Sequence, residues 1–159
     1  MTAARKFKVR NRLSAAMFDG GGKLVGQAIA DAQAELSVLS PAREATICET
    51  VAAISKTWGP GAANRDATGP MDLYVLVLTI IDVSDSSALR GLPEACNSFC
   101  DLLDHCTEVG AWDWPAVDVH IATIQCLSID TTLSEADRMK LVSGLARLMN
   151  HRNQASETP

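Results

Sequence analysis

The sequence predicts an all-α protein, a single antiparallel bundle of five to six helices. Apolar residues recur at spacings of three and four along most of the chain, and helix-start signals such as Ser40-Pro41 and Asp113 precede several of these segments. The connecting segments are short, and no stretch alternates with the period of two that a half-buried strand requires. Together these features indicate a helical bundle.

Length and composition bound the class of protein. The chain has 159 residues, of which 47% are hydrophobic and 21% are charged, as expected for one globular domain. No uncharged apolar run reaches the roughly 18 residues of a membrane span, so we expect no membrane partner. The five cysteines lack zinc-type spacing and no secretory apolar segment is present, which favours reduced thiols and a cytoplasmic location.

The chain is expected to have three parts. Residues 1–20 are predicted to be a basic flexible arm, residues 21–150 the helical bundle, and residues 151–159 a frayed tail. The first 18 residues contain five basic side chains and no acidic one, a composition also typical of targeting segments, and the two interpretations stay open. Between Asp82 and Asp137 there are eleven acidic residues and one basic residue, Arg90, so the folded part is not expected to bind nucleic acid.

The first two predicted helices share a short junction. Residues 24–39 place apolar side chains on one helical face, namely Leu24, Val25, Ala28, Ile29, Ala32, Leu36 and Leu39. Ser40 and Pro41 suit the N-cap and first position of a second helix, which continues to Trp58. We therefore expect an antiparallel hairpin of two helices, followed by a mobile connector over residues 58–70.

The most apolar segment runs from Leu73 to Val83. It follows the Gly69-Pro70 breaker and contains no further turn signal before Gly91, so it predicts a helix from Pro70 to near Gly91. Because nearly all of its faces are apolar, we expect this helix at the centre of the bundle.

The next segment, from Pro93 to about Val109, is clearly amphipathic. Its predicted inward side chains are Ala95, Phe99, Leu102, Leu103 and Cys106. Its outward face carries an acidic stripe, formed by Glu94, Asp101, Asp104 and Glu108. The stripe predicts a docking site for a protein with a basic surface; a solvated face that only maintains solubility is the alternative.

Two further helices complete the bundle. Asp113, between Trp112 and Trp114, is a predicted N-cap, and Val117, Ile121, Ile124 and Ser128 form the inward line of the helix that follows. The last helix starts at a capping box, either Thr132 to Glu135 or Ser134 to Asp137. Met139, Val142, Leu145 and Met149 are its expected inward residues.

The histidines raise the alternative of a degenerate phosphotransfer protein that uses His105 or His120. Such a domain places Lys and then a small residue after its histidine, whereas Thr123 and Ile124 follow His120. His105 is surrounded by Asp101 and Glu108, whose charge would repel a phosphoryl group.

No pattern in the sequence indicates an enzyme. There is no Ser-His-Asp set, nucleophile elbow or dinucleotide fingerprint, and the glycines after Asp19 lack the spacing of a Walker A loop. No Glu-x-x-His pair occurs, and the cysteines are expected to be core thiols. We therefore expect no catalytic residue, no metal site and no cofactor.

Three stretches resemble a group of known proteins: Phe18–Leu36, Gly91–Asp104 and Trp112–Gln125. They are similar to small helical proteins of unassigned biochemistry that are associated with chemotaxis and two-component genes in alphaproteobacteria. The resemblance implies a cytoplasmic bundle that binds signalling proteins such as a response regulator or a kinase, and it supplies no catalytic residue. The resulting hypothesis is a regulatory or adaptor bundle, with phosphotransfer or a nucleic-acid contact through the basic arm as alternatives.

Overall fold

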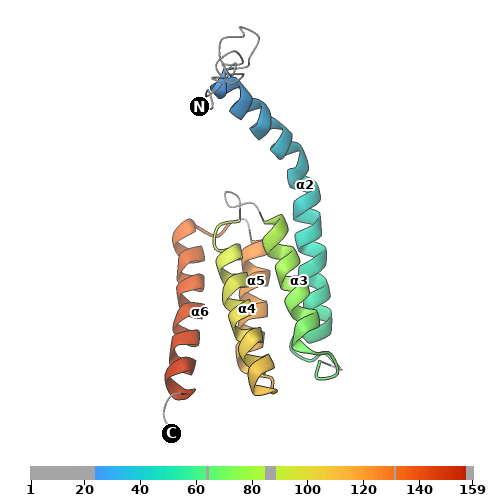
Figure 1. The fold of residues 1–159 in the computed structure, drawn as a ribbon, viewed down its shortest axis with the longest axis vertical. Coiled ribbons are helices and arrows are strands. Elements are labelled where there is room, and N and C mark those ends of the chain that lie inside the picture. The colour runs from blue at the N-terminus through green and yellow to red at the C-terminus, as the bar shows by residue number, and fades with distance from the viewer. Residues whose placement is uncertain (1–23, 64, 85–88, 131, 157–159) are drawn as a thin grey trace, which may run out of the picture. The chain divides into compact units, whose positions relative to one another are not determined.

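The computed structural model describes residues 24–63, 65–84, 89–130 and 132–156. The described residues are helical apart from turns and connectors, so the predicted all-α bundle is confirmed (Figure 1). The chain divides into two compact units, Met1–Leu39 and Ser40–Pro159. The predicted basic arm, residues 1–20, lies outside the described residues.

Five helices are present in the described part of the chain. Their bounds are α2, Val25–Trp58; α3, Pro70–Val83; α4, Leu92–Val109; α5, Trp114–Ile129; and α6, Glu135–Ser156. From the second half of α2 onward, consecutive helices run in opposite directions, as the colours of Figure 1 show. None of these helices is long and apolar enough to cross a membrane. Helix α6 continues to Ser156, so residues 151–156 of the predicted tail are helical.

The helical hairpin expected around Ser40-Pro41 does not form. Both residues lie inside α2, which is continuous from Val25 to Trp58. Strong helix formers stand on both sides of the proline, including Ala34, Glu35 and Ala42, and they allow the helix to continue through a residue that cannot donate a backbone hydrogen bond. The boundary between the two compact units falls just before this pair.

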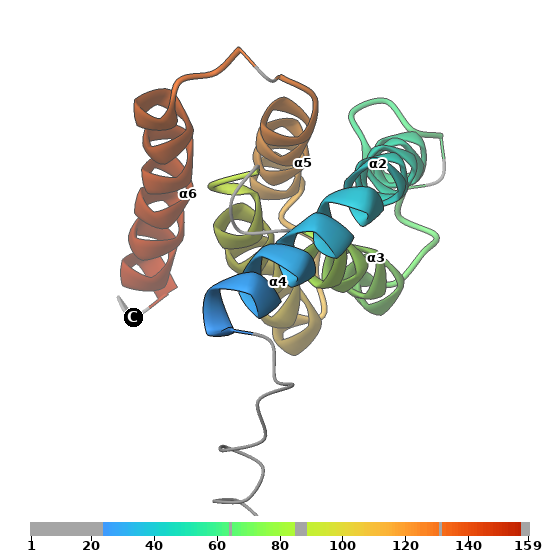
Figure 2. The same ribbon diagram turned by 90° about the horizontal axis from the view of Figure 1, so that it is seen from above.

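Helix α4, rather than α3, is the central element of the bundle. It packs against α3, α5 and α6, and the view along the bundle in Figure 2 shows it between α3 and α6. The apolar helix α3 leaves Met71, Val75 and Leu78 exposed. It also ends at Val83, so Gly91 does not terminate α3 but adopts a left-handed conformation (φ 88°) as the N-cap of α4.

The core confirms most of the predicted inward residues. The five residues predicted for α4 are at most 1% exposed, and Val117, Ile121 and Ile124 of α5 are at most 2% exposed. In α6, Leu145 is buried, but Met139 is half exposed, which corrects the prediction for that residue. Ile47, Val51, Ile54 and Trp58 from the second half of α2 join the same core.

Helix ends follow the local signals. Asp113 Oδ1 accepts a hydrogen bond from the backbone N–H of Ala116 at 3.2 Å, as expected for an N-cap. At α6, Ser134 Oγ accepts from the N–H of Asp137 at 3.2 Å, so the second of the two predicted frames is the one used. Arg138 donates to the carbonyls of Leu127 and Asp130 at the end of α5, although it is only 7% exposed. This buried cation caps carbonyls that the helix leaves unpaired.

Candidate functional site

The four acidic residues predicted to bind a partner lie on the outer surface of α4. Glu94, Asp101, Asp104 and Glu108 are all exposed, and we call them the acidic face. Spacings of seven, three and four place them along one side of the helix. None of the four makes an ion pair with another described residue. Their charge is therefore not neutralised within this part of the chain.

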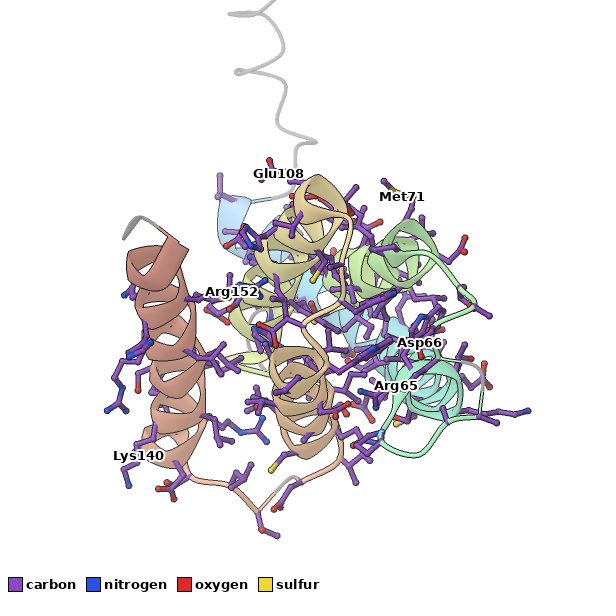
Figure 3. All side chains as sticks on the ribbon, turned by 90° about the horizontal axis from the view of Figure 1, so that it is seen from below. Arg65, Asp66, Met71, Glu108, Lys140 and Arg152 are labelled. Carbon is purple, nitrogen blue, oxygen red and sulfur yellow. The ribbon has the colours of Figure 1, made fainter. Side chains whose placement is uncertain are left out.

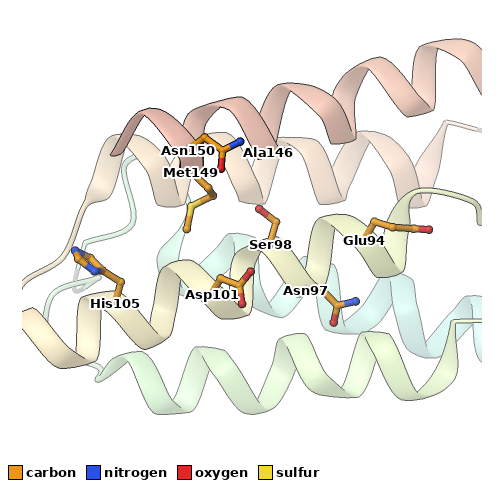
Figure 4. A pocket seen from close by; sticks show the side chains of 8 residues that line it. All are labelled: Glu94, Asn97, Ser98, Asp101, His105, Ala146, Met149 and Asn150. Carbon is orange, nitrogen blue, oxygen red and sulfur yellow. The ribbon is translucent and has the colours of Figure 1, made fainter. Parts of the chain in front are cut away.

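A groove of about 520 Å³ runs between α4 and α6 beside this face (Figure 4). From α4 it is lined by Glu94, Asn97, Ser98, Asp101 and His105, and from α6 by Ala146, Met149 and Asn150. Two carboxylates and two side-chain amides offer oxygen acceptors, while Met149 and Ala146 offer apolar contact. No Lys or Arg lines the groove. Such a lining suits a side chain with an apolar stem and a cationic end.

Only two of the four residues of the acidic face line the groove. Glu94 and Asp101 line the groove toward α6, whereas Asp104 and Glu108 do not. The negative charge of Asp104 is the largest cause of the raised pKa of Tyr74 in α3, followed by Cys100, burial and the charge of Asp101. The structure thus brings two of the predicted residues into a groove and leaves the other two on the open surface.

His120, one of the two phosphotransfer candidates, is fully buried behind the groove. Its Nδ1 lies 2.8 Å from the carbonyl oxygen of Ala116, which can only accept, so Nδ1 carries the proton. Its Nε2 then accepts from the Ser98 hydroxyl at 3.0 Å, and the ring stacks on Phe99 at a centroid distance of 5.2 Å. Burial lowers the pKa of His120, so the neutral form is favoured.

These contacts bear on the phosphotransfer alternative. A phosphorelay histidine must be reached by the aspartyl phosphate of its partner, and both ring nitrogens of His120 are occupied inside the protein. His105 is half-buried and lines the groove, so it is the histidine on which this alternative still depends. Asp101 lines the same groove, and its negative charge opposes the approach of a phosphoryl group.

A second charged cluster, which the sequence did not reveal, surrounds the start of α5. We call it the α5 corner; it consists of Arg65, Asp66, Asp113, Trp114, Asp118 and Arg152. Arg65 donates to both carboxylate oxygens of Asp118, with a shortest distance of 3.1 Å, and its guanidinium lies 3.8 Å from the centre of the Trp114 ring. Asp66 accepts from Trp114 Nε1 at 2.7 Å, and Arg152 of α6 pairs with Asp113 at 3.0 Å. Of these residues, Arg65, Asp66 and Arg152 are labelled in Figure 3.

The α5 corner changes the interpretation of the connector between α2 and α3. Residues 58–70 were expected to be mobile, but Arg65 and Asp66 attach this segment to α5. The spacing between Arg65 and Asp118 is 53 residues, so no local pattern could have indicated the contact. The cluster is internally paired and we assign it a structural role.

Other candidate chemistry is not supported in the described residues. No group of three His, Cys, Asp or Glu side chains there is arranged to hold a metal ion. Cys96 and Cys100 are buried thiols, and burial raises their pKa values to about 12 and about 11, which keeps them protonated and unreactive.

Comparison with known proteins adds no family. No protein-family model matches the chain, and no curated protein or solved structure matches it either. The resemblance to proteins associated with chemotaxis and two-component genes therefore stays a prediction.

Proposed function

We propose that this protein is a non-enzymatic regulatory or adaptor bundle that binds a basic protein surface through the acidic face of α4. The observation that carries the proposal is the concentration, on one side of α4, of four exposed carboxylates without an ion pair to another described residue. Asp113, Asp118, Glu135 and Asp137 each pair with an Arg or Lys, whereas the four residues of the acidic face do not. Unpaired carboxylates repel one another, and a basic partner would relieve that repulsion.

The groove beside α4 supports the same proposal. A flat acidic surface attracts cations without selecting among them, but a groove can hold one side chain in a fixed position. Glu94 and Asp101 lie on one wall and Met149 lies on the other, which fits a Lys or Arg side chain of the partner. A signalling protein such as a response regulator or a kinase is the partner class that we propose.

The test is co-purification from an extract of the native cell with three baits. The first bait is the wild-type chain, and the second carries Asp101→Lys, Asp104→Lys and Glu108→Lys. The third is a matched control that reverses three acidic residues elsewhere, Glu44→Lys, Glu49→Lys and Asp82→Lys. These three residues are also exposed, so both triple variants change the net charge equally. Mass spectrometry then identifies proteins retained by each bait.

We expect a basic partner to be retained by the wild type and by the control, but not by the α4 variant. Binding should also weaken between about 0.15 M and about 1 M salt, because the screening length falls from about 8 Å to about 3 Å. Retention by all three baits would reject docking at the acidic face. Loss from both variants would show that only net charge matters, and the proposed site would be wrong.

A further inference from the structure

The first half of α2 carries an apolar seam that is not part of the observed core. Val25, Ile29, Leu36 and Leu39 are 75%, 52%, 47% and 52% exposed, and Ala32 between them is exposed as well. The five residues follow one another at spacings of four, three, four and three, the heptad spacing of a coiled coil. We call these five residues the α2 seam. It ends at Leu39, since the next position in the pattern is Arg43.

We infer that the α2 seam pairs with the seam of a second copy of this chain, so that the protein forms a two-fold dimer. Heptad spacing makes a stripe complementary to itself, because each seam residue of one helix packs between residues of the same stripe on the other. Ala28, Ala30, Ala32 and Ala34 are strong helix formers, so the seam is presented on a segment with high intrinsic helix propensity.

The residues beside the seam favour a second copy over a charged partner. The flanking positions are Gly26, Ala28, Gln33 and Glu35, which include a single charge. Two identical helices can therefore approach without a row of like charges, and a basic or acidic protein would find little to recognise. Ala32 at the middle of the seam is small and lets the two backbones come close.

The length of the seam limits the area that a dimer can bury. The 15 residues from Val25 to Leu39 span roughly 21 Å, which is two heptads. A helix pair of this size lies at the small end of specific interfaces, below roughly 1,200 Å². We therefore expect a weak dimer, populated at about tens of micromolar protein or above.

Sedimentation equilibrium of the full chain, from about 5 µM to about 200 µM, tests the inference. The wild-type mass should rise from that of a single chain, 16.9 kDa, toward twice that value. Leu36→Asp and Ile29→Asp place a charge on the seam and should weaken dimerisation at least tenfold, about 1.4 kcal/mol. Val38→Asp is the matched control, because Val38 is 77% exposed on the same helix but lies off the seam.

The outcomes separate the inference from its alternatives. A wild-type chain that stays monomeric across the range overturns it. A dimer that survives Leu36→Asp and Ile29→Asp shows that another surface pairs, which also overturns it. Equal loss in Val38→Asp would show that helicity or net charge, rather than the seam, is responsible. Circular dichroism of each variant checks that the helix content is unchanged.

Discussion

The α5 corner and the acidic face of α4 both contain aspartates, but two of those in the α5 corner are paired with arginines, whereas those of α4 pair with no described cation. At the α5 corner, Asp113 and Asp118 each face an arginine, and the side chains of Arg65 and Arg152 are only 16% and 17% exposed. On α4, Asp101 and Asp104 are exposed and face no cation among the described residues. A partly buried carboxylate needs a partner within the fold, whereas an exposed one can remain available to another molecule.

The largest expected effect comes from breaking the α5 corner without changing its charges. A Cβ atom added at Gly59 would lie 2.3 Å from the backbone oxygen of Ser55, so Gly59→Ala must displace the segment that carries Arg65. We expect a loss of about 3 kcal/mol in the free energy of unfolding, measured by urea denaturation.

Gly69→Ala, at the other end of the same connector, is the control for this prediction. A Cβ atom there meets nothing within 4 Å. The change should cost less than about 1 kcal/mol. Equal costs at both glycines would mean that close packing at Gly59 is not what shapes the connector.

The second prediction neutralises one carboxylate of the α5 corner. Asp118→Asn removes the anion that Arg65 contacts through two nitrogens and leaves a cation that is 16% exposed. We expect a destabilisation of about 2 kcal/mol, since a charged hydrogen bond is lost and the arginine remains partly desolvated. Thermal and urea unfolding of the variant measure it, and a change below about 0.5 kcal/mol would contradict a structural role for the pair.

The third prediction concerns His120, which is influenced by both regions. Burial lowers its pKa, while the charges of Asp101 and Asp113 act in the opposite direction. Because the unfolded chain then binds a proton more readily than the folded one, stability is fully present above the ordinary histidine pKa of about 6.5. It should fall as the pH drops below that value toward the lowered pKa.

Unfolding free energies measured between pH 5 and pH 8 should show this decline in the wild type. His120→Gln cannot titrate in this range, so its stability should vary less with pH. The decline in the unfolding free energy of the wild type between pH 8 and pH 5 is expected to be smaller than the destabilisation caused by Asp118→Asn. A decline of the same size in the glutamine variant would assign the pH dependence to other groups.

The smallest expected effect is on α4 and has the opposite sign. Asp104 lies three residues after Asp101 and four before Glu108, so it repels two neighbouring carboxylates. Asp104→Asn should stabilise the fold by about 0.3 kcal/mol, whereas the same substitution at Asp118 destabilises it. Destabilisation by more than about 1 kcal/mol would show that Asp104 has a structural partner, and the contrast between the two regions would disappear.

The features that could be predicted from the sequence depend on neighbouring residues. The inward face of α4, the Asp113 cap and the Ser134 cap follow from spacings of three and four, and the structure confirms them. The hairpin at Ser40-Pro41 was wrong because the same pair can begin a helix or lie within one. Periodicity also could not identify the central helix, since an apolar face does not show which element covers it.

Part of the candidate site could likewise be predicted from the sequence, and part could not. The acidic face was visible in the sequence because its four residues belong to one helix. The groove needed α6, and the contact between Ser98 and His120 joins residues that are 22 apart on two helices. Contacts between distant residues depend on how the helices pack, which a single sequence does not encode in any local pattern.

The distribution of cysteines has a practical consequence for spectroscopy. Cys96, Cys100 and Cys106 are buried in the core, Cys126 is partly covered, and Cys48 is exposed on α2. A maleimide dye added for a short time at neutral pH should therefore attach to Cys48 first, in the wild-type chain. One fluorophore at a known position would then report on partner binding by anisotropy without any engineered cysteine.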